Sequence, residues 1–295
     1  MNIETSKQWK MINKLKPNDI DWDCFKSSDY FHKITTWDPS VNGKRYLKML
    51  LYNVGMTLSK EHFEYMNKTK NRNLGYPISV KINNCEFDFD YLHSALELEV
   101  ITVSGARNIL EIGAGYGRTP HSIISNMNVD TYTILDLPEM LSFARDYLYR
   151  VLSDEQFKKI RFVSVIDFDN LDNSHFDLII QIDGFNEMTK DVVDCYLDYI
   201  ESHCNYFYTR NPLGNYHEID LVDTSLDKQL NTNMRNNAVS SGNLTNTVDI
   251  HNNDEIEKNV SLFEGAYLPS DNWKLRISSW SQPVSYMWQC LYEKN

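Results

Sequence analysis

The chain has 295 residues, of which 42% are hydrophobic and 24% charged, and this balance is typical of a globular protein. Its formal net charge of −12 argues against nucleic acid and anionic lipid as partners, because binding either one needs clustered Lys and Arg. The five cysteines are scattered and odd in number, which argues against a disulfide framework and a zinc site.

Residues 1–90 have helical hydrophobic patterns and many aromatic side chains, and they predict a helical cap on a catalytic domain at 91–295. The first 16 residues contain no apolar signal-peptide core, and no segment approaches the ~18 apolar residues of a membrane span. We therefore expect a cytoplasmic protein without a membrane span. Asp90 is expected to cap a helix that leads into the first strand.

Short apolar runs alternate with helical patterns between about residues 107 and 210, which predicts a Rossmann-like, doubly wound, mostly parallel α/β sheet. Helices are expected to start at the Thr119 cap, at Pro138, at Ser153, which has capping-box spacing to Gln156, and at the Thr189 cap. The expected strands are 108–112, 131–135, 161–166, 176–182 and 205–209.

The alternation ends after Arg210. Residues 211–260 are rich in Asn, Asp, Ser and Thr, and they predict a long insertion or lid. Two strand-like runs follow at 273–280 and 286–292, separated by a short turn. We expect them to form an antiparallel hairpin that closes the parallel sheet.

A glycine-rich loop follows the first expected strand. Glycines at 113, 115 and 117 come directly after Glu111 and an apolar run, and glycine lets a ligand approach the backbone where a strand turns into a helix. The dinucleotide fingerprint would need glycine at 118, where this chain has Arg118. The alternative to a ligand site is a merely structural turn.

Asp136 ends the second expected strand, 19 residues after Gly117. The two oxygens of a carboxylate at this edge can accept hydrogen bonds from both hydroxyls of a ribose. The alternative is that Asp136 only caps the Pro138 helix. Because the loop and this acid both follow strands of one sheet, we expect a nucleoside there.

The pattern of an acid followed by GxGxG resembles the first motif of class I S-adenosylmethionine (SAM)-dependent methyltransferases. The runs EIGAGYGRTPHSI, ILDLPEML and IDGFNEM resemble more narrowly a bacterial sugar O-methyltransferase family, over roughly residues 74–215. The resemblance implies SAM as cofactor and a hydroxyl of a sugar or glycan precursor as acceptor. The SAM-binding residues that it and the loop indicate are Glu111, Gly113, Ala114, Gly115, Gly117, Asp136, Leu137, Asp167 and Phe168.

The roles of Asp167 and Phe168 are implied by the resemblance alone. It implies that Asp167 accepts a hydrogen bond from the adenine amino group and that Phe168 packs against the adenine ring. The alternative is that Asp167 is simply solvated in an acidic loop.

Transfer of a methyl group to oxygen requires a base for the hydroxyl proton. The candidates are His217, Asp183 and Glu187, with His121 behind them; Glu187 could equally cap the Thr189 helix, and a lone His in a polar loop is often a surface residue. The side chains expected to bind the acceptor are Tyr76, Tyr116, Asn186, Arg210 and Tyr216, with Tyr91 nearby.

Some O-methyltransferases hold Mg²⁺ between an acid after the fourth strand and an Asp-Asn pair after the fifth. Here Asp183 fits, but Arg210 replaces one expected carboxylate, so we assign no metal. The alternative is an oxygen ligand from Asp220, Asp223 or Asp227 in the insertion.

Other functions stay open. They are methylation of a non-sugar small molecule or a peptide natural product, and a non-catalytic SAM-binding subunit. The oligomeric state stays open too, including a homo-oligomer.

Overall fold

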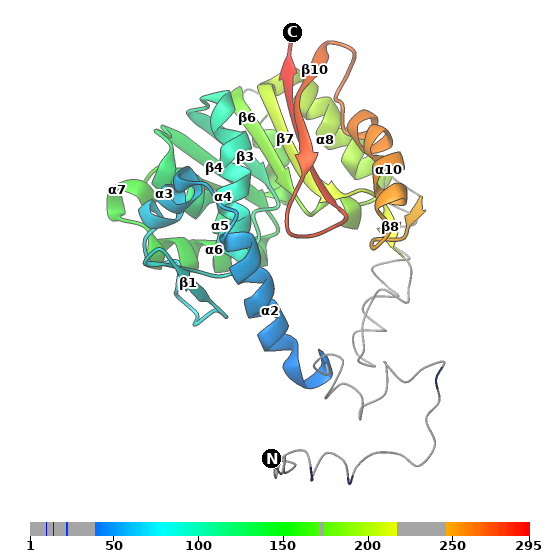
Figure 1. Ribbon diagram of the computed structural model, residues 1–295. Helices are drawn as coiled ribbons and strands as arrows, with labels where there is room; N and C mark the ends of the chain where they lie inside the picture. The colour runs from blue at the N-terminus through cyan, green and yellow to red at the C-terminus, as the bar shows by residue number, and fades with distance from the viewer. Residues whose placement is uncertain (1–9, 11–13, 15–21, 23–38, 172–173, 217–245) are drawn as a thin grey trace.

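The computed structural model describes residues 10, 14, 22, 39–171, 174–216 and 246–295 (Figure 1). Its centre is a seven-stranded sheet with five parallel strands and an antiparallel hairpin at one edge. The predicted fold class is confirmed. The strands, in spatial order, are β10 (Trp273–Trp280), β11 (Met287–Lys294), β7 (Cys204–Pro212), β6 (Phe176–Ile182), β3 (Asn108–Ile112), β4 (Thr131–Asp136) and β5 (Ile160–Ser164).

Helices cover both faces of this sheet. One face packs against α4 (Phe89–Ile101), α5 (Arg118–Asn126) and α6 (Pro138–Val151), and the other against α8 (Lys190–His203) and α10 (Asn253–Ala266). The remaining elements are α2 (Pro39–Gly55), α3 (Lys60–Lys68), β1 (Val80–Ile82), β2 (Cys85–Phe87), η3 (Thr102–Ser104), α7 (Asp154–Phe157), η4 (Val165–Leu171), η5 (Phe185–Glu187), β8 (Asn215–Tyr216) and β9 (Thr247–Val248).

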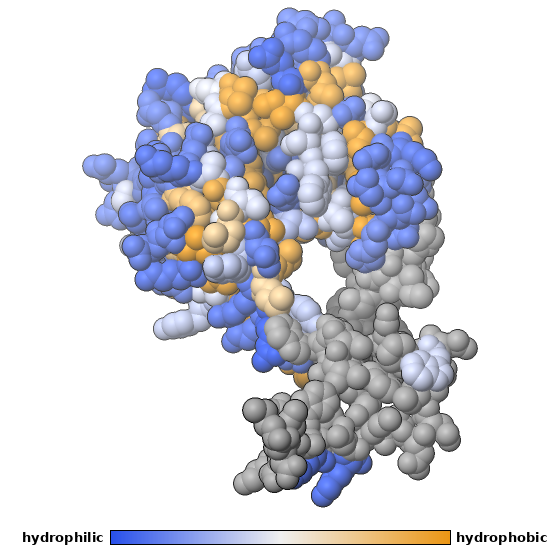
Figure 2. Space-filling model, in the orientation of Figure 1, coloured by the Kyte–Doolittle hydropathy of each residue, from blue (hydrophilic) through white to orange (hydrophobic). Residues whose placement is uncertain are grey.

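The two cores follow from the apolar runs of the strands. Successive residues of a strand face opposite sides of the sheet, so Ile109 joins the core under α4–α6 and Leu110 the core under α8 and α10. Both side chains are fully buried. Hydrophilic side chains cover the outward faces of α3 and α10, in keeping with the charged composition (Figure 2). No helix in the described ranges has the length and apolar character to cross a bilayer.

The strand order places a switch point between β3 and β6. The chain runs from β3 to β4 on one side, and later returns to place β6 on the other side of β3. Helices that connect strands in opposite directions leave a crevice outside the carboxyl ends of these two strands, where open α/β sheets bind their ligands. The glycine loop follows β3 directly.

Two expected helix caps lie at other residues in the structure, and a third lies at the expected residue but lacks the side-chain bond. α5 begins at Arg118, after Gly117 in the left-handed conformation, so Thr119 lies inside the helix. α4 is capped by Asp88, whose Oδ1 accepts a hydrogen bond from the Tyr91 N–H at 3.0 Å, and the predicted cap Asp90 lies in the first turn. Thr189 is the N-cap of α8 but makes no side-chain cap bond. The capping box of Ser153 is confirmed.

The ends of the chain differ in part from the expected boundaries. β7 continues to Pro212, and α10 starts at Asn253, inside the polar stretch expected to be an insertion. Phe263 of α10 is fully buried in the core beside α8, so this helix belongs to the sheet domain. On the N-terminal side, Leu51 and Leu92 share one core, and the β1–β2 hairpin was not predicted. Residues 217–245 lie outside the described part, and the domain division stays a prediction.

Candidate functional site

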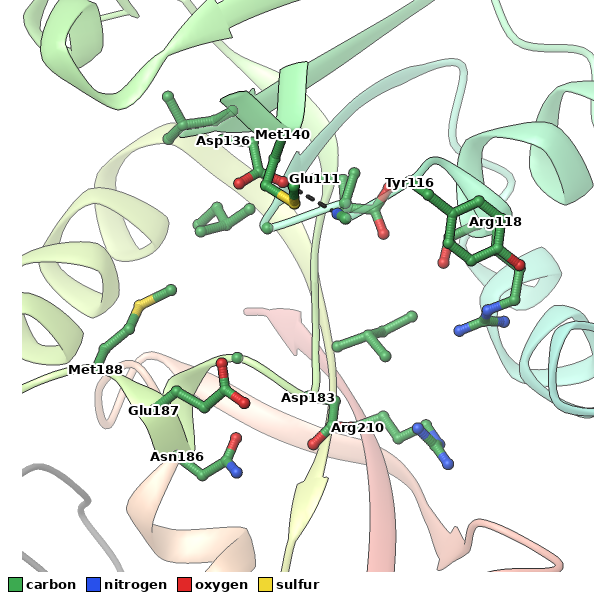
Figure 3. A pocket seen from close by; sticks show the side chains of 18 of the residues that line it. Glu111, Tyr116, Arg118, Asp136, Met140, Asp183, Asn186, Glu187, Met188 and Arg210 are labelled. Carbon is green, nitrogen blue, oxygen red and sulfur yellow. Dashed lines mark hydrogen bonds between the residues drawn. The ribbon is translucent and has the colours of Figure 1, made fainter. Parts of the chain in front are cut away.

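A cavity of about 1150 Å³ opens at the carboxyl ends of β3 and β6 (Figure 3). The glycine loop, the start of α6, η5, the end of β7 and the turn before β11 contribute to its walls. The switch point of the sheet and this cavity therefore coincide.

The backbone of the glycine loop is left-handed at all three glycines, with φ values of +77°, +55° and +100° at 113, 115 and 117. A Cβ atom at Gly113 or Gly115 would meet nothing within 4 Å and would enter the hollow. A Cβ at Gly117 would lie 2.9 Å from Leu148 Cγ of α6, and Gly117 does not line the cavity. The first two glycines thus leave room for a ligand, whereas Gly117 allows close helix packing, which corrects its expected role.

Asp136 faces the cavity from the end of β4 and ties the glycine loop to the next strand. Its carboxylate accepts hydrogen bonds from the Gly115 N–H at 3.0 Å and the Leu137 N–H at 2.7 Å (Figure 3). Burial raises the pKa of Asp136, and these backbone donors oppose that effect. The N-cap of α6 is Leu137, so capping that helix is not the role of Asp136. Each oxygen keeps a second lone pair for a ligand.

Glu111 lies at the cavity floor, at the penultimate position of β3. Its side chain is buried and accepts a hydrogen bond from the Tyr132 hydroxyl at 2.8 Å. Burial raises the pKa of Glu111 to about 7, although Tyr132 and Arg118 favour the ionised form. Near neutral pH this group therefore exists in both protonation states, which suits an interior position better than a permanent charge.

Two carboxylates, Asp183 and Glu187, line the opposite side of the cavity after β6 (Figure 3). The backbone of Asp183 is left-handed, with φ of 53°, and its N–H donates to the Arg210 carbonyl at 2.7 Å. Burial raises the pKa values of both carboxyl groups. The charge of Asp183 raises the pKa of Glu187 further, whereas Arg210 and Arg118 oppose the rise in the pKa of Asp183. Both side chains are open to the hollow, where they can exchange a proton with a ligand.

Most other predicted site residues also reach the cavity. Its lining includes Ala114, Tyr116, Leu137, Asn186 and Arg210. The fold thus brings predicted residues from four separate segments of the chain together at one cavity.

Three predicted residues lie elsewhere. Asp167 is exposed and Phe168 packs against Tyr199, with ring centroids 4.9 Å apart; neither lines the cavity, where Val165 at the start of η4 does. Tyr76 follows the turn at Gly75 with φ of 56°, and its side chain is 99% exposed. This turn directs Tyr76 to solvent, so its expected role at the acceptor is not supported.

The histidine candidates are not placed in the cavity. His217 lies outside the described residues, and so does the side chain of Tyr216. His121 is fully buried in α5, where its Nδ1 lies 2.6 Å from the Tyr91 hydroxyl, and burial lowers its pKa to about 4. Neither His121 nor Tyr91 lines the cavity, which removes His121 as a base.

The structure adds residues that the sequence did not indicate. Arg118 and His93 line the cavity together with Arg210, and Met140, Met188 and Tyr196 add apolar groups to the lining. Arg118 was noted only as a departure from the dinucleotide fingerprint. His93 lies in the middle of an expected helix, where a single polar residue gives no signal of function.

The alternative magnesium site combined Asp183 with an acid of the insertion. Asp220, Asp223 and Asp227 lie outside the described residues, and the described part of the chain contains no group of three His, Cys, Asp or Glu side chains suited to a metal. The alternative stays a hypothesis.

No family model and no curated protein sequence matches this chain. Its fold is similar to that of several solved structures. An O-methyltransferase family protein from Burkholderia thailandensis is 13% identical with a TM-score of 0.42, and the match covers 70% of this chain and 58% of that one. The methyltransferase domain of bacterial CtHen1-C is 12% identical with a TM-score of 0.48, covering 68% and 96%. Mitomycin 7-O-methyltransferase MmcR is 12% identical with a TM-score of 0.43, covering 97% and 67%. These likenesses concern the fold alone.

Proposed function

We propose that this protein is a SAM-dependent O-methyltransferase that transfers the methyl group to a hydroxyl of a sugar or glycan precursor. The observation that carries the proposal is the pairing of an open glycine loop with Asp136 at the switch point of the sheet. A carboxylate beside a backbone without side chains is the arrangement that a nucleoside requires.

Three features of the cavity support SAM as its ligand. Gly113 and Gly115 leave the space that the ligand would fill, and Asp136 keeps acceptor capacity for the ribose hydroxyls. Leu137, Met140 and Val165 offer an apolar surface to an adenine ring on the same side. Because Asp167 and Phe168 lie outside the lining, we assign the adenine contact to these apolar side chains.

SAM supplies a methyl group on a positively charged sulfur, which an oxygen nucleophile can attack in line. In this chain, Asp183 and Glu187 are the groups that would accept the hydroxyl proton, since both face the cavity and both have raised pKa values. A carboxylate with a raised pKa is a stronger base than one at its ordinary value. The surrounding walls align the acceptor and reduce its contact with water.

The sugar acceptor rests on the sequence resemblance, and the polar lining near the two acids is compatible with it. Asn186, Glu187 and Asp183 can bond to several hydroxyls of one ring. A non-sugar small molecule is the alternative acceptor, and release of S-adenosylhomocysteine (SAH) in a screen of nucleotide sugars against phenols and carboxylic acids would discriminate the two.

Calorimetry tests the cofactor assignment. We expect wild-type protein to bind SAM and Asp136→Ala to bind it at least about 10-fold more weakly, since two charge-assisted hydrogen bonds are lost. Asp130→Ala is the control, because Asp130 is an exposed carboxylate at the opposite end of β4, paired with Arg107. Folded wild-type protein that binds no SAM would refute the proposal; binding without turnover on any acceptor would favour a non-catalytic subunit.

A further inference from the structure

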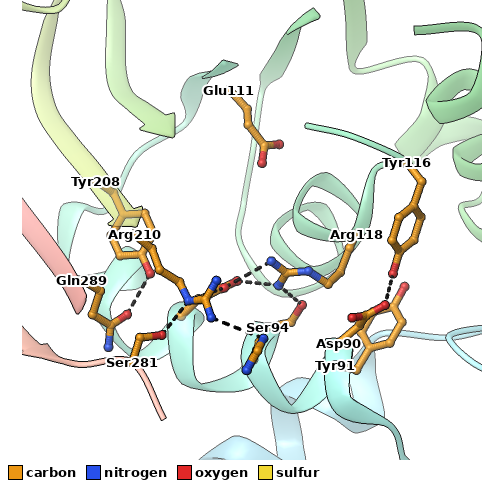
Figure 4. Close-up of polar contacts among 12 residues, drawn as sticks. Asp90, Tyr91, Ser94, Glu111, Tyr116, Arg118, Tyr208, Arg210, Ser281 and Gln289 are labelled. Atoms are coloured by element: carbon orange, nitrogen blue, oxygen red, sulfur yellow. Dashed lines mark hydrogen bonds and ion pairs between the residues drawn. The ribbon is translucent and has the colours of Figure 1, made fainter. Parts of the chain in front are cut away.

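A buried charge cluster forms the cavity wall between α4, α5 and β7 (Figure 4). Glu97 of α4 binds Arg118 with both oxygens, at 2.5 and 3.1 Å, and lies 3.6 Å from Arg210 Nε. Arg118 also donates to Ser94, and Arg210 to Ser281 at 2.6 Å. One carboxylate thus serves two guanidinium groups, which leaves one positive charge without a directly bonded acid.

His93 extends this cluster toward the cavity. Its Nδ1 lies 3.5 Å from Arg210 Nη2, and a guanidinium can only donate, so Nδ1 is the acceptor and the ring proton lies on Nε2. His93 is 8% exposed and lines the cavity. Its Nε2 atom has no hydrogen-bond partner among the described residues. Burial and the two arginines hold the pKa of His93 well below its usual value, which keeps the ring neutral.

A buried N–H group without a partner costs free energy, and a ligand that accepts its hydrogen bond recovers that cost. The donors that this wall offers to a ligand are His93 Nε2–H and the remaining guanidinium N–H groups of Arg118 and Arg210. A carboxylate, which has two acceptor oxygens and a single negative charge, matches these donors. Asp183, whose carboxylate is coupled electrostatically to both arginines, disfavours a dianion such as phosphate.

We propose that His93, Arg118 and Arg210 form a binding site for a ligand carboxylate. The proposal rests on the proposed function for its choice of ligands, because two molecules of that reaction can bring a carboxylate here. One is SAM, through its methionine end, and the other is an acceptor sugar that carries an acid group.

Calorimetry with four probes separates these sources. SAH carries the amino-acid carboxylate, 5′-methylthioadenosine lacks it, and glucuronate is an acidic sugar with glucose as its neutral match. The variant His93→Phe keeps a ring of similar size but removes the donor, and His93→Gln restores an N–H group. His175→Phe is the control, since His175 is exposed near the opposite ends of the strands. Thermal unfolding verifies that each variant is folded.

If the site binds the methyl donor, His93→Phe weakens SAH binding about 10-fold or more, His93→Gln restores part of it, and 5′-methylthioadenosine binds as before. If the site binds the acceptor, SAH binding is unchanged and the preference for glucuronate over glucose is lost in His93→Phe. Equal weakening of SAH and 5′-methylthioadenosine, or no change with any probe, overturns the carboxylate site. A wild-type protein that binds glucuronate through His93 but neither adenosine compound would retain the site and refute the proposed function.

Discussion

The two ends of the cavity are built in different ways. At the glycine-loop end, residues 111–117 form one short segment and Asp136 follows on the adjacent strand, joined to it by the Gly115 N–H. At the charged end, His93 and Arg210 meet although 117 positions separate them, and Ser281 comes from a third segment. A local backbone conformation determines the first end, whereas the second exists only after the helices and the hairpin have packed on the sheet.

The largest effect should come from breaking the charged end. Glu97→Gln keeps the size of the side chain but leaves Arg118 and Arg210 buried without their shared carboxylate. Removing one partner of a buried ion pair typically costs about 3–5 kcal/mol, so the free energy of unfolding in urea should fall by that amount. Glu99→Gln, on the same helix with a 63% exposed side chain, should cost less than about 1 kcal/mol. Equal losses of stability in the two variants would show that the ion pairs of Glu97 with Arg118 and Arg210 do not stabilise the fold.

Glu111, between the two ends, should make stability depend on pH. Burial raises its pKa to about 7 from an ordinary 4.5, so the folded protein retains a proton that the unfolded chain has released. Stability should therefore fall as pH rises from about 4.5 to about 7, by about 3 kcal/mol from this group. The fall in stability over this pH range should be absent in Glu111→Gln. It should remain in Glu139→Gln, the control at an exposed position. Urea unfolding at pH 5 and pH 8 measures both; identical pH dependence in wild type and Glu111→Gln would contradict the assignment.

This contrast explains what the sequence could predict. Strands β3 and β6 have the expected boundaries, because apolar runs that end at glycine or a polar turn are local signals. The same kind of local signal indicated the glycine loop and Asp136, and Gly113, Gly115 and Asp136 line the cavity. His93 was missed, because its neighbours in space are remote in sequence. Tyr76 was wrongly assigned to the cleft, because aromatic composition does not report which way a turn directs a side chain.

The proposed ligand contact at the glycine-loop end can be tested by adding a side chain to the loop. Gly115→Val places a branched side chain at φ of +55° and directs it into the cavity. Gly105→Val meets equal backbone strain at φ of +59° and equally open space, but at an exposed turn after η3. Both should lose about 1–2 kcal/mol of stability, and only Gly115→Val should lose affinity for SAH, by about 100-fold. A similar affinity loss in both variants would show that strain alone, and no ligand contact, explains the effect.

The smallest effects should come from Tyr116 and Tyr76, which the sequence predicted equally to bind the acceptor. Tyr116 lines the cavity and donates to Asp90 at 2.8 Å, so Tyr116→Phe should lose about 1 kcal/mol of stability with the bond. Tyr76 is 99% exposed, and Tyr76→Phe should change stability by less than about 0.5 kcal/mol and leave SAH binding unaltered. Because the two substitutions remove the same hydroxyl, any difference comes from its surroundings. If Tyr76→Phe bound SAH more weakly, Tyr76 would contact the ligand, and its turn would have to move toward the cavity when the ligand binds.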